Sequence, residues 1–547
     1  MNETLTGGAA THNDTATDEL DVLIVGAGFA GVYQLFTLRE RGFRCRILEA
    51  GSTLGGIWHW NCYPGARVDT WCYLYQYSRE DLWRDWNWSE MFPDWQELRR
   101  YFEYVDRKLD ISRDVRFNTR VVGAEFDEAA CQWVVRAQDG SVTRAQHVVL
   151  CTGFAAKPYI PAFKGLETFA GAVHHTGQWP QDGLDFNGRR VGVIGTGASA
   201  VQVIQEASRD ARHLTVFQRS PAMAIPMQQH KLSEAEQDQM KQHYAEKFRL
   251  RAQTACGYDF SWRPGSALSL PAAERVAFYE SLWAQGGFPF WLANFEDVIC
   301  NREANDTAYA FWRDKVRARI KDAVLQEKLA PMQAPYAFGC KRVSLEQWYY
   351  DLWDQPNVSL IDIKASPIQE ITSRGIVTAE GEVPLDIIVM GTGFDAVSGG
   401  ILAIAVRGTD GRLMSEKWQG GVRTFLGLSS AGYPNMYIMY GPQSPSGWSN
   451  GPTTAEVQGD MVVRIIEDMR RQGVRRIEAT VAAEDAWVAH TRDVANMTLI
   501  PQTDSWYNGT NIPGKPVEVL NYGGGLPTYG AKFAESADNG YAGFRLG

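Results

Sequence analysis

Two glycine-rich loops in this chain have a spacing suited to the diphosphate of a dinucleotide. Residues 26–31 read GAGFAG, and residues 195–200 read GTGASA. Glycines at these intervals let the backbone approach a diphosphate, and a helix that starts at the loop presents N–H groups to the negative charge. The residues expected to contact a dinucleotide are Gly26, Gly28, Phe29 and Gly31 in the first loop, and Thr196, Gly197, Ser199 and Ala200 in the second.

The two loops lead to side chains of opposite charge. Glu49 follows the first loop, and Arg219 follows the second at a similar spacing. A carboxylate at this position accepts hydrogen bonds from a free ribose diol, whereas a guanidinium pairs with a phosphate on the ribose. The pattern therefore predicts FAD in the first site and NADPH in the second.

Each loop has flanking elements that would hold it in place. Apolar strands are expected over residues 21–25 and 190–194, and helical stretches over residues 32–41 and 201–207. A glycine loop alone often marks an ordinary turn, so the combination of strand, loop and helix is what favours nucleotide binding. It predicts an α/β fold with two Rossmann-like dinucleotide-binding domains.

The order of the elements predicts that the chain leaves the first domain and later returns to it. Strands that run into small-residue turns are expected twice, at residues 146–153 and 386–394, and a long stretch of helical composition lies between them. We expect a disordered tail at residues 1–18, an FAD-binding domain from residues 19–155 and 388–547, an NADP-binding domain from residues 156–230 and 335–387, and a helical insertion into the NADP domain at residues 231–334.

Composition and charge limit the partners. The chain has 547 residues, 45% of them hydrophobic, which suffices for two or three domains with substantial cores. A net charge of -10 argues against nucleic acid, and the basic stretch at residues 312–321 is interpreted as the solvated face of a helix. No apolar run reaches the length of a membrane span, and the first eighteen residues lack the pattern of a signal peptide. The expected location is the cytoplasm, away from membranes.

The eight cysteines contain no CxxC pair. Their scatter gives no sign of a zinc ribbon or of a redox-active disulfide. Reduced, partly buried packing residues are expected, and no metal is predicted.

A string between the two loops resembles a family signature. Phe169, Gly171, His175 and Trp179, followed by Pro180, match the FxGxxxHxxxW pattern of type I Baeyer-Villiger monooxygenases. Related flavin monooxygenases that oxidise nitrogen or sulfur typically carry Tyr or Phe at the last position. The spacing of His175 and Trp179 would also let them simply pack together. In the family this string is thought to couple domain motion, so it is assigned no chemical step.

The resemblance extends to both sides of this string. Residues 55–70 look like the flavin-side motif of the family, and residues 291–295 and 311–319 are similar to its cyclopentanone monooxygenase branch. In the sequence FGCKR, Arg342 matches the active-site arginine of the family, and Lys341 matches the lysine that recognises the ribose phosphate of NADP. The resemblance implies a small-molecule ketone, with a ring ketone as the leading class, and O2 as substrates.

The implied reaction needs a fixed positive charge beside the flavin. A reduced flavin captures dioxygen as a peroxide, which must stay anionic to attack the ketone carbonyl, so that a cyclic ketone becomes a lactone. A guanidinium lowers the pKa of the peroxide and stabilises the oxyanion formed on attack. By resemblance, Arg342 has this role and Asp69 holds it in place, although Asp69 could instead be an ordinary turn residue.

Further positions are expected to contact the cofactors or the substrate. Trp506 lies in residues 505–515, which resemble a mobile C-terminal loop that closes over NADP and excludes water. Phe154 and Trp448 could equally be rim packing, and Trp448 replaces a smaller Phe of the branch, which leaves the ring-size preference open. The other expected cofactor contacts are Ile57, Trp58, Trp60, Tyr75, Val122, Gln202 and Ser220, and the expected substrate contacts are Phe154, Ala155, Gly447 and Trp448.

Two other functions stay open at this point. An N- or S-oxidising flavin monooxygenase is disfavoured by Trp179 and by the match at Lys341 and Arg342. A non-catalytic sensor that uses FAD structurally would carry the same two loops. The sequence gives no indication of the oligomeric state.

Overall fold

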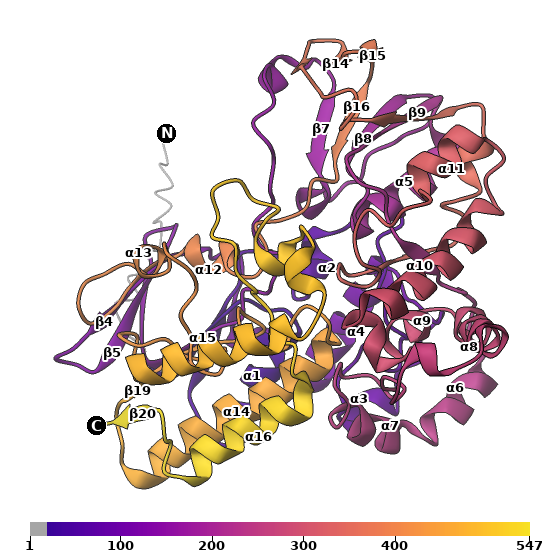
Figure 1. The fold of residues 1–547 in the computed structure, drawn as a ribbon. Helices are drawn as coiled ribbons and strands as arrows, with labels where there is room; N and C mark the ends of the chain where they lie inside the picture. Colours follow the sequence, from indigo (N-terminus) through magenta and orange to yellow (C-terminus); the bar gives the residue numbers. More distant parts are fainter. Residues whose placement is uncertain (1–18) are drawn as a thin grey trace, which may run out of the picture.

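Two mainly parallel sheets form the framework of the molecule. The structure is a computed structural model that describes residues 19–547, so the expected disordered tail at residues 1–18 lies outside the described part. Figure 1 shows the two sheets in separate lobes, with a group of helices beside the second. This arrangement confirms the predicted α/β fold class.

The first sheet joins strands from the start of the described chain to strands beyond residue 400. Its central strand, β1 (Glu19–Val25), is buried from Val22 onward, which explains the nearly unbroken apolar run of this segment. The strand order is β17 (Ala405–Arg407), β4 (Val121–Asp127), β5 (Gln132–Ala137), β6 (Val142–Leu150), β1, β2 (Cys45–Leu48) and β3 (Val115–Arg116), and β18 (Met436–Ile438) also pairs with β6.

The second sheet has five strands, and all of its pairings are parallel. The expected domain boundary between residues 387 and 388 falls inside its strand β16 (Ile387–Met390). This boundary needs correction, because β16 is buried and hydrogen-bonded on both sides within the second sheet, which extends at least to Met390. The strand order is β12 (Val358–Asp362), β9 (His213–Gln218), β8 (Arg190–Ile194), β16 and β7 (Ala172–His175).

A helix starts at each glycine loop, as the sequence predicts. α1 (Phe29–Glu40) follows the first loop, and α5 (Ala198–Asp210) follows the second. The long helix α14 (Gly451–Gln472) packs against α1 at Gly459, where a Cβ atom would lie only 2.5 Å from the ring of Tyr33. The other helices of this lobe are α2 (Ile57–Trp60), α3 (Glu80–Trp83), α4 (Trp95–Leu109), α12 (Gly399–Leu402), α13 (Met414–Lys417), α15 (Val481–Asn496) and α16 (Gly525–Asp538).

Helices occupy the segment that was expected to form an insertion. Its two ends meet where β10 (Ala224–Pro226) pairs in parallel with β11 (Ser344–Glu346). The basic stretch lies mostly on α10 (Arg302–Arg317), which buries Trp312 and Val316 and exposes Asp314, as expected for a helix with one solvated face. The remaining helices here are α6 (Glu234–Lys241), α7 (Tyr244–Arg251), α8 (Ala272–Gln285), α9 (Pro289–Leu292) and α11 (Ala323–Leu329).

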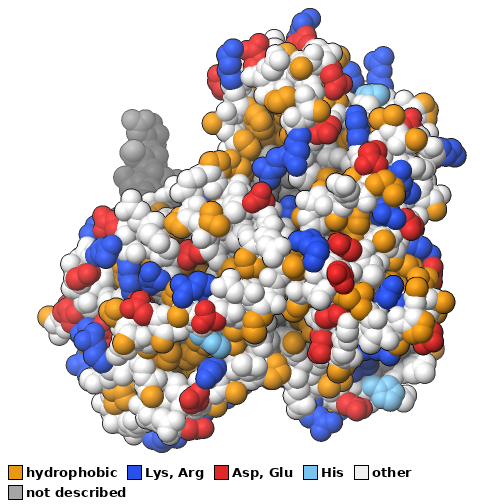
Figure 2. All heavy atoms as spheres, in the orientation of Figure 1, with side chains coloured by type: hydrophobic (Ala, Val, Ile, Leu, Met, Phe, Trp, Pro, Cys, Tyr) orange, Lys and Arg blue, Asp and Glu red, His pale blue; other side chains and the backbone are white. Residues whose placement is uncertain are grey.

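Short strands complete the fold at its edges. An antiparallel unit lies at the tip of the second lobe, and a two-stranded pair lies near the C-terminus (Figure 1). Figure 2 shows basic and acidic side chains interspersed over the face in view. The short strands are β13 (Glu370–Ile371), β14 (Gly375–Thr378), β15 (Gly381–Pro384), β19 (Ile477–Ala479) and β20 (Phe544–Leu546).

Candidate functional site

The two glycine loops pack against the two small-residue turns in the same way. Gly26 has a φ of +103°, and a Cβ atom there would lie 2.6 Å from the carbonyl oxygen of Cys151. Gly195 has a φ of +106°, and its Cβ would lie 2.3 Å from the carbonyl oxygen of Gly391. Both positions therefore require glycine. Each loop and its turn form one backbone cradle, so the two turns belong to two separate sites.

The first cradle has the features that an FAD site needs. Gly28 and Gly56 touch backbone to backbone, since a Cβ on Gly56 would lie 2.8 Å from the Cα of Gly28. Gly31 lies equally close to the loop, because its Cβ would meet the oxygen of Gly26 at 1.8 Å. Phe29, at the start of α1, is half-buried within an aromatic cluster that includes Tyr75. The backbone is thus shaped for a close-fitting diphosphate.

Glu49 lies at the edge of this first cradle. Its carboxylate accepts hydrogen bonds from the backbone N–H groups of Ala27 and Gly51, both at 2.6 Å. Burial raises the pKa of Glu49, and these two backbone hydrogen bonds oppose that rise. Each carboxylate oxygen keeps a second acceptor position. Glu49 is thus placed beside the loop as predicted, already anchored on one side and able to accept from a ribose diol.

The second cradle is more open. A Cβ atom on Gly197 would meet nothing within 4 Å, so this loop leaves free space for a ligand. The hydroxyl of Thr196 donates to the carbonyl of Ser220 at 2.6 Å, which ties the loop to the end of β9. The hydroxyl of Ser199 lies 3.1 Å from that of Thr176, and Ala200 is fully buried. The cradle therefore fits the diphosphate of a second dinucleotide.

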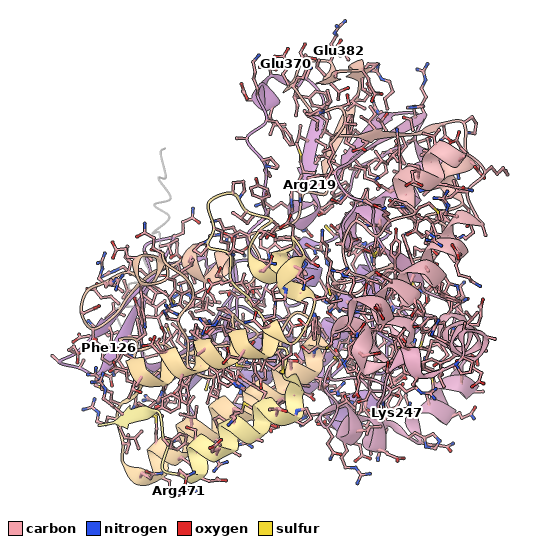
Figure 3. The ribbon with its side chains drawn as sticks, viewed as in Figure 1. Phe126, Arg219, Lys247, Glu370, Glu382 and Arg471 are labelled. Carbon is pink, nitrogen blue, oxygen red and sulfur yellow. The ribbon has the colours of Figure 1, made fainter. Side chains whose placement is uncertain are left out.

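Two cations flank the second cradle. Burial and then the charge of Arg219 lower the pKa of Lys341 from its ordinary value to about 8. The same amine lies 4.1 Å from the centre of the Tyr336 ring. Arg219 itself is exposed, and Figure 3 shows it where the second lobe meets the body of the molecule, well below Glu370 and Glu382 at the tip. The structure thus brings Arg219 and Lys341 together at a position suited to a phosphate.

Gln202 connects the second cradle to the flavin-side motif. Its side-chain oxygen accepts a hydrogen bond from the Tyr63 hydroxyl at 2.8 Å, and its amide nitrogen donates to the carbonyl of Arg67 at 3.0 Å. Both partners lie in the segment that leads to Asp69. Gln202 therefore lies between the two lobes. Both polar atoms of its side-chain amide already have a partner, so a contact with a dinucleotide would add to these two hydrogen bonds.

Arg342 and Asp69 form a two-pronged ion pair between the lobes. The Nε and Nη2 atoms of Arg342 donate to the two carboxylate oxygens of Asp69 at 2.8 and 2.9 Å. Its Nη1 atom donates to the carbonyl of Gly447 at 3.1 Å. Such paired geometry fixes the plane of the guanidinium as well as its position.

The guanidinium of Arg342 is fixed in place but keeps hydrogen-bond donors without a partner. Three of its five N–H donors have partners in the structure, which leaves two for a ligand. Burial disfavours the charged form, but the charge and hydrogen bonds of Asp69, together with the hydroxyls of Tyr258 and Tyr507, raise the pKa of Arg342 well above its ordinary value. The ring of Phe288, from the insertion, lies 5.1 Å from the guanidinium carbon. Arg342 is therefore a permanent, oriented cation with donors to spare.

The aromatic residues expected beside the FAD lie around the first cradle. Trp58 and Tyr75 meet edge to face with ring centres 5.8 Å apart, and the buried indole N–H of Trp58 has no hydrogen-bond partner among the described residues. An orphaned buried donor of this kind fits a polar ligand atom nearby. Trp60 is half-buried against His59, and Ile57 begins α2.

Val122 lies apart from these aromatic residues. Its side chain is 40% exposed on β4, at a point where the strand register shifts. Nothing in the structure ties it to the glycine loop, so its expected cofactor contact gains no support.

The expected substrate positions Phe154 and Trp448 contact two neighbouring aromatic residues, Trp506 and Tyr507. Phe154 stacks on Trp506 with ring centres 5.5 Å apart and an angle of 22° between the planes. Trp448 meets Tyr507 edge to face at 6.4 Å, and Gly447 holds Arg342 through its carbonyl. Ala155 is half-buried in the turn beside Phe154. The structure thus gathers these positions around the segment between α15 and α16.

Two side chains of the signature string, His175 and Trp179, contact different parts of the molecule. His175 accepts a hydrogen bond from the N–H of Gly177 at Nδ1 and donates from Nε2 to the carbonyl of Gly393 at 2.8 Å. Burial lowers the pKa of His175 to about 4, so the ring is neutral at pH 7 and this tautomer satisfies both bonds. Trp179 packs against Tyr63 on the other side. The two side chains therefore contact different partners and do not simply pack on each other.

Three side chains at the site were not predicted. From the insertion, Phe288 reaches Arg342, and Tyr258 reaches Thr70, which follows Asp69; from the C-terminal segment, Tyr507 reaches Gly447. An aromatic residue in a helical or loop segment usually serves the core, and no motif surrounds Phe288 or Tyr258. Tyr507 follows Trp506 directly, so the resemblance at residues 505–515 was the available signal.

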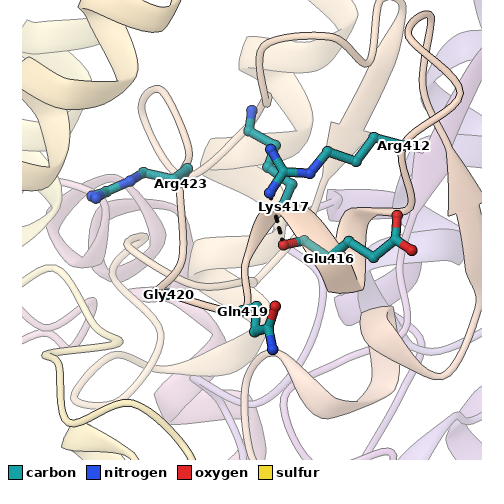
Figure 4. A pocket seen from close by; sticks show the side chains of 7 residues that line it. Arg412, Glu416, Lys417, Gln419, Gly420 and Arg423 are labelled. Carbon is teal, nitrogen blue, oxygen red and sulfur yellow. Dashed lines mark hydrogen bonds between the residues drawn. The ribbon is translucent and has the colours of Figure 1, made fainter.

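Two surface hollows lie outside the predicted site residues. One, of about 390 Å³, is lined at α13 by Arg412, Glu416, Lys417, Gln419, Gly420, Gly421 and Arg423 (Figure 4). The amine of Lys417 is already engaged by the carboxylate of Glu484 at 2.8 and 2.9 Å, and Arg412 donates to the backbone of Glu416. The other hollow, of about 340 Å³, borders Trp179.

Residues 19–547 contain neither a cluster of metal ligands nor a helix suited to span a membrane. Within that range, His, Cys, Asp and Glu side chains form no group of three or more that could hold a metal ion. No helix in the same range combines the length and apolar character of a membrane span. All eight cysteines lie in the described part and are free thiols.

Comparison with known proteins finds monooxygenases whose names give different substrates. Residues 20–230 match the flavin-binding monooxygenase-like family model. Cyclopentanone 1,2-monooxygenase of Comamonas sp. is 50% identical, over 98% of this chain and 97% of that protein. Phenazine N-monooxygenase of Lysobacter antibioticus is 37% identical, over 97% of this chain and 98% of that protein. The crystal structure of OTEMO in complex with FAD and NADP superposes with a TM-score of 0.93 at 35% identity, covering 96% of this chain and 99% of that one.

Fold, site and relatives together define a flavoprotein monooxygenase. Within that class, the chain belongs to the Baeyer-Villiger monooxygenases, as the sequence signature predicted. Membership confirms that it is an enzyme, and the hypothesis of a non-catalytic sensor is not retained.

Proposed function

We propose that the enzyme binds FAD at the first glycine loop and NADPH at the second. The two backbone cradles and the orphaned N–H of Trp58 support two dinucleotides, and Glu49 beside the first cradle suits a free ribose. Arg219 and Lys341 beside the second suit the ribose phosphate of NADPH. OTEMO, which shares the fold, was solved with both cofactors.

The proposed domain organisation follows from these sites. Residues 19–155 and the segment after β16 form the FAD-binding domain, and residues 156–230 together with 335–390 form the NADP-binding domain. The insertion at residues 231–334 supports the junction between them, because it supplies Phe288 beside Arg342. The site therefore combines side chains from all three units. The proposed location of the enzyme is the cytoplasm.

The proposed reaction is the oxygenation of a ketone. A ketone, O2, NADPH and a proton give an ester, NADP and water, and a cyclic ketone gives a lactone. The bound flavin supplies the activation of dioxygen. The chain supplies orientation, exclusion of water and a fixed charge.

Arg342 supplies that charge. The observation that carries the proposal is its two-pronged pair with Asp69, which orients a cation and leaves two N–H donors free between the lobes. Donors fixed before the reaction stabilise an oxyanion without having to reorganise. Asp69 does not react in this scheme, since both its oxygens are occupied in holding Arg342.

A ring ketone is the proposed substrate class. Phe154 stacks on Trp506, and Trp448 packs edge to face on Tyr507, which shares the Gly447 carbonyl with Arg342, while Ala155 and Gly447 add little bulk. Such a lining suits a hydrocarbon ring whose carbonyl is its main polar group. The relative from Comamonas carries the name of a cyclopentanone-oxidising enzyme.

The test is a ketone panel with product analysis. Purified, FAD-loaded enzyme is given NADPH, air and cyclopentanone, cyclohexanone, a linear ketone or an aromatic ketone, and the products are identified by mass spectrometry. We expect lactones from the cyclic ketones. NADPH consumption that yields only hydrogen peroxide with every ketone would contradict the proposal.

N-oxidation is a second candidate, because one relative is named a phenazine N-monooxygenase. The free donors of Arg342 favour an oxyanion over a neutral amine, so we rank it below ketone oxidation. Incubation with phenazine decides between the two. An N-oxide formed by an enzyme that leaves cyclopentanone untouched would reverse the order.

A further inference from the structure

The hydroxyl of Tyr507 and the guanidinium of Arg342 share one acceptor, the carbonyl of Gly447. Tyr507 donates to this oxygen at 3.0 Å, and the Nη1 atom of Arg342 donates to it at 3.1 Å. A carbonyl oxygen has two lone pairs, so both are taken. We propose that Tyr507 is a positioning residue for Arg342, because it fixes the carbonyl that holds one arm of the guanidinium while Asp69 holds the rest.

Tyr507 is itself buried and tightly packed. It is 1% exposed and packs in a small apolar cluster with Cys340, two residues before Arg342. A Cβ atom on Gly447 would lie 2.8 Å from the ring of Tyr507, so the ring abuts the backbone that it bonds. The Tyr507 side chain thus supports Arg342 in two ways. It packs on Cys340, close to the Arg342 backbone, and it bonds the Gly447 carbonyl that also holds the Arg342 guanidinium.

The position of Tyr507 depends on how the C-terminal segment docks. The N–H of Leu520 donates to the carbonyl of Tyr507 at 2.8 Å. Farther along the segment, Asn511 donates to the carbonyl of Phe394, and Lys515 pairs with Asp395, both at 2.8 Å. These partners lie in the turn that follows β16 of the second sheet. In Figure 1 the segment between α15 and α16 lies across the middle of the molecule. Docking of this segment therefore places Tyr507 on Gly447.

The consequence rests on the proposed function of Arg342. Without the Tyr507 hydroxyl, the Gly447 carbonyl keeps one donor and is less firmly placed, while the ion pair with Asp69 remains. Arg342 then stays charged, but its free donors are less well aimed at the reacting oxygen. In the proposed scheme, neither Gly447 nor the Tyr507 hydroxyl takes part in the reduction of the flavin by NADPH. Oxygenation should therefore suffer more than reduction.

The test compares Tyr507→Phe with Tyr522→Phe in FAD-loaded enzyme. Tyr522 lies in the same part of the chain, and its hydroxyl bonds His490 rather than any residue of the site. Two quantities are measured: the anaerobic rate of flavin reduction by NADPH, and the moles of lactone formed per mole of NADPH consumed with cyclopentanone. For Tyr507→Phe we expect a reduction rate near wild type and a product ratio about three- to tenfold lower, the usual range for one lost hydrogen bond.

Tyr522→Phe is the control for the loss of a tyrosine hydroxyl outside the site. Tyr522→Phe should keep both quantities near wild type. A Tyr507→Phe enzyme with the wild-type product ratio, or with reduction slowed as much as oxygenation, overturns the role of Tyr507 alone. Wild-type enzyme that forms no lactone overturns the proposed function and this inference with it. Phe keeps the ring packing; should the variant still lose FAD, Tyr507→Met removes the donor with a smaller and more flexible side chain, and a wild-type product ratio in that variant would equally overturn the role.

Discussion

The carboxylate of Asp69 grips the guanidinium of Arg342 through two hydrogen bonds, across 273 positions of sequence. The pair joins the FAD-side motif to the segment after the insertion. Its geometry is the feature on which the proposed chemistry depends, because it orients a cation whose two remaining donors are free.

Replacement of Arg342 should separate reduction from oxygenation. We expect Arg342→Ala to keep FAD and to consume NADPH, but to form lactone about 100- to 1,000-fold more slowly, as when an oxyanion donor is removed. Arg342→Lys keeps a charge but cannot form the two-pronged pair, so we expect it to recover little of the loss. Lactone formation by Arg342→Ala at the wild-type rate would remove this residue from the chemistry. The measurement is product formation followed beside NADPH absorbance.

The affinity for NADPH should fall as pH rises through about 8. The pKa of Lys341 is lowered to about 8 by burial and by Arg219, so the free enzyme loses this charge above that pH. A bound ribose phosphate favours the charged amine, and binding is therefore strongest below pH 8. Titration of NADP binding from pH 7 to 9 measures the effect.

Lys341→Met is the matched control for this pH dependence. The variant should bind NADPH weakly at every pH, without the decline near pH 8, and should bind NADH about as well as wild type does. The same decline in Lys341→Met would assign the titration to another group.

Two glycine substitutions should have opposite outcomes. Gly31→Ala places a Cβ 1.8 Å from the oxygen of Gly26, so we expect an enzyme that retains little FAD. Gly197→Ala meets no atom within 4 Å, so the enzyme should fold and hold FAD. Its added methyl occupies the space proposed for the second diphosphate, and we expect NADPH affinity to fall by at least about tenfold. Flavin absorbance and NADPH titration measure both; full NADPH affinity in Gly197→Ala would contradict the second site.

A buried ion pair should matter for stability. Arg251, from the insertion, is 1% exposed and pairs with Glu456 of α14 at 2.8 Å, while also donating to the carbonyls of Leu74 and Gln76. Removing one partner leaves a buried charge alone, at a cost of about 3 to 5 kcal/mol. We expect Arg251→Met to lower the melting temperature markedly.

The exposed pair of Arg84 and Glu80 provides the comparison. Arg84→Met should change the melting temperature little, since exposed pairs contribute about 0 to 1 kcal/mol. Equal decreases of the melting temperature in the two variants would show that burial of the Arg251 pair does not increase its contribution to stability.

Local patterns in the sequence predicted most of the framework. The strands before both glycine loops and the helices after them depend on short apolar runs and glycine spacing, so they could be placed from nearby residues. The boundary at residues 387 and 388 was misplaced, because the strand Ile387–Met390 has no local sign of which sheet it joins. Sheet membership is a long-range property, and only the pairing with β7 and β8 decides it.

In the site as well, residues within local motifs could be predicted, whereas residues that act through long-range contacts could not. Arg342, Asp69 and Lys341 were named through motifs, and their roles stay proposals; the variants of Arg342 and Lys341 described above test two of them. Phe288 and Tyr507 went unnamed, because their contacts join segments far apart in the chain: Tyr507 meets a carbonyl 60 positions away. Val122 was expected at a cofactor; its side chain lies exposed on β4, and this expected contact stays a prediction without structural support.

Labelled oxygen tests the proposed reaction most directly. Wild-type enzyme is incubated with NADPH, cyclopentanone and ¹⁸O2, and the product is examined by mass spectrometry. We expect a six-membered lactone that contains one labelled oxygen atom, with the second atom recovered in water. An unchanged ketone with all the label in hydrogen peroxide, or a lactone without label, would contradict it.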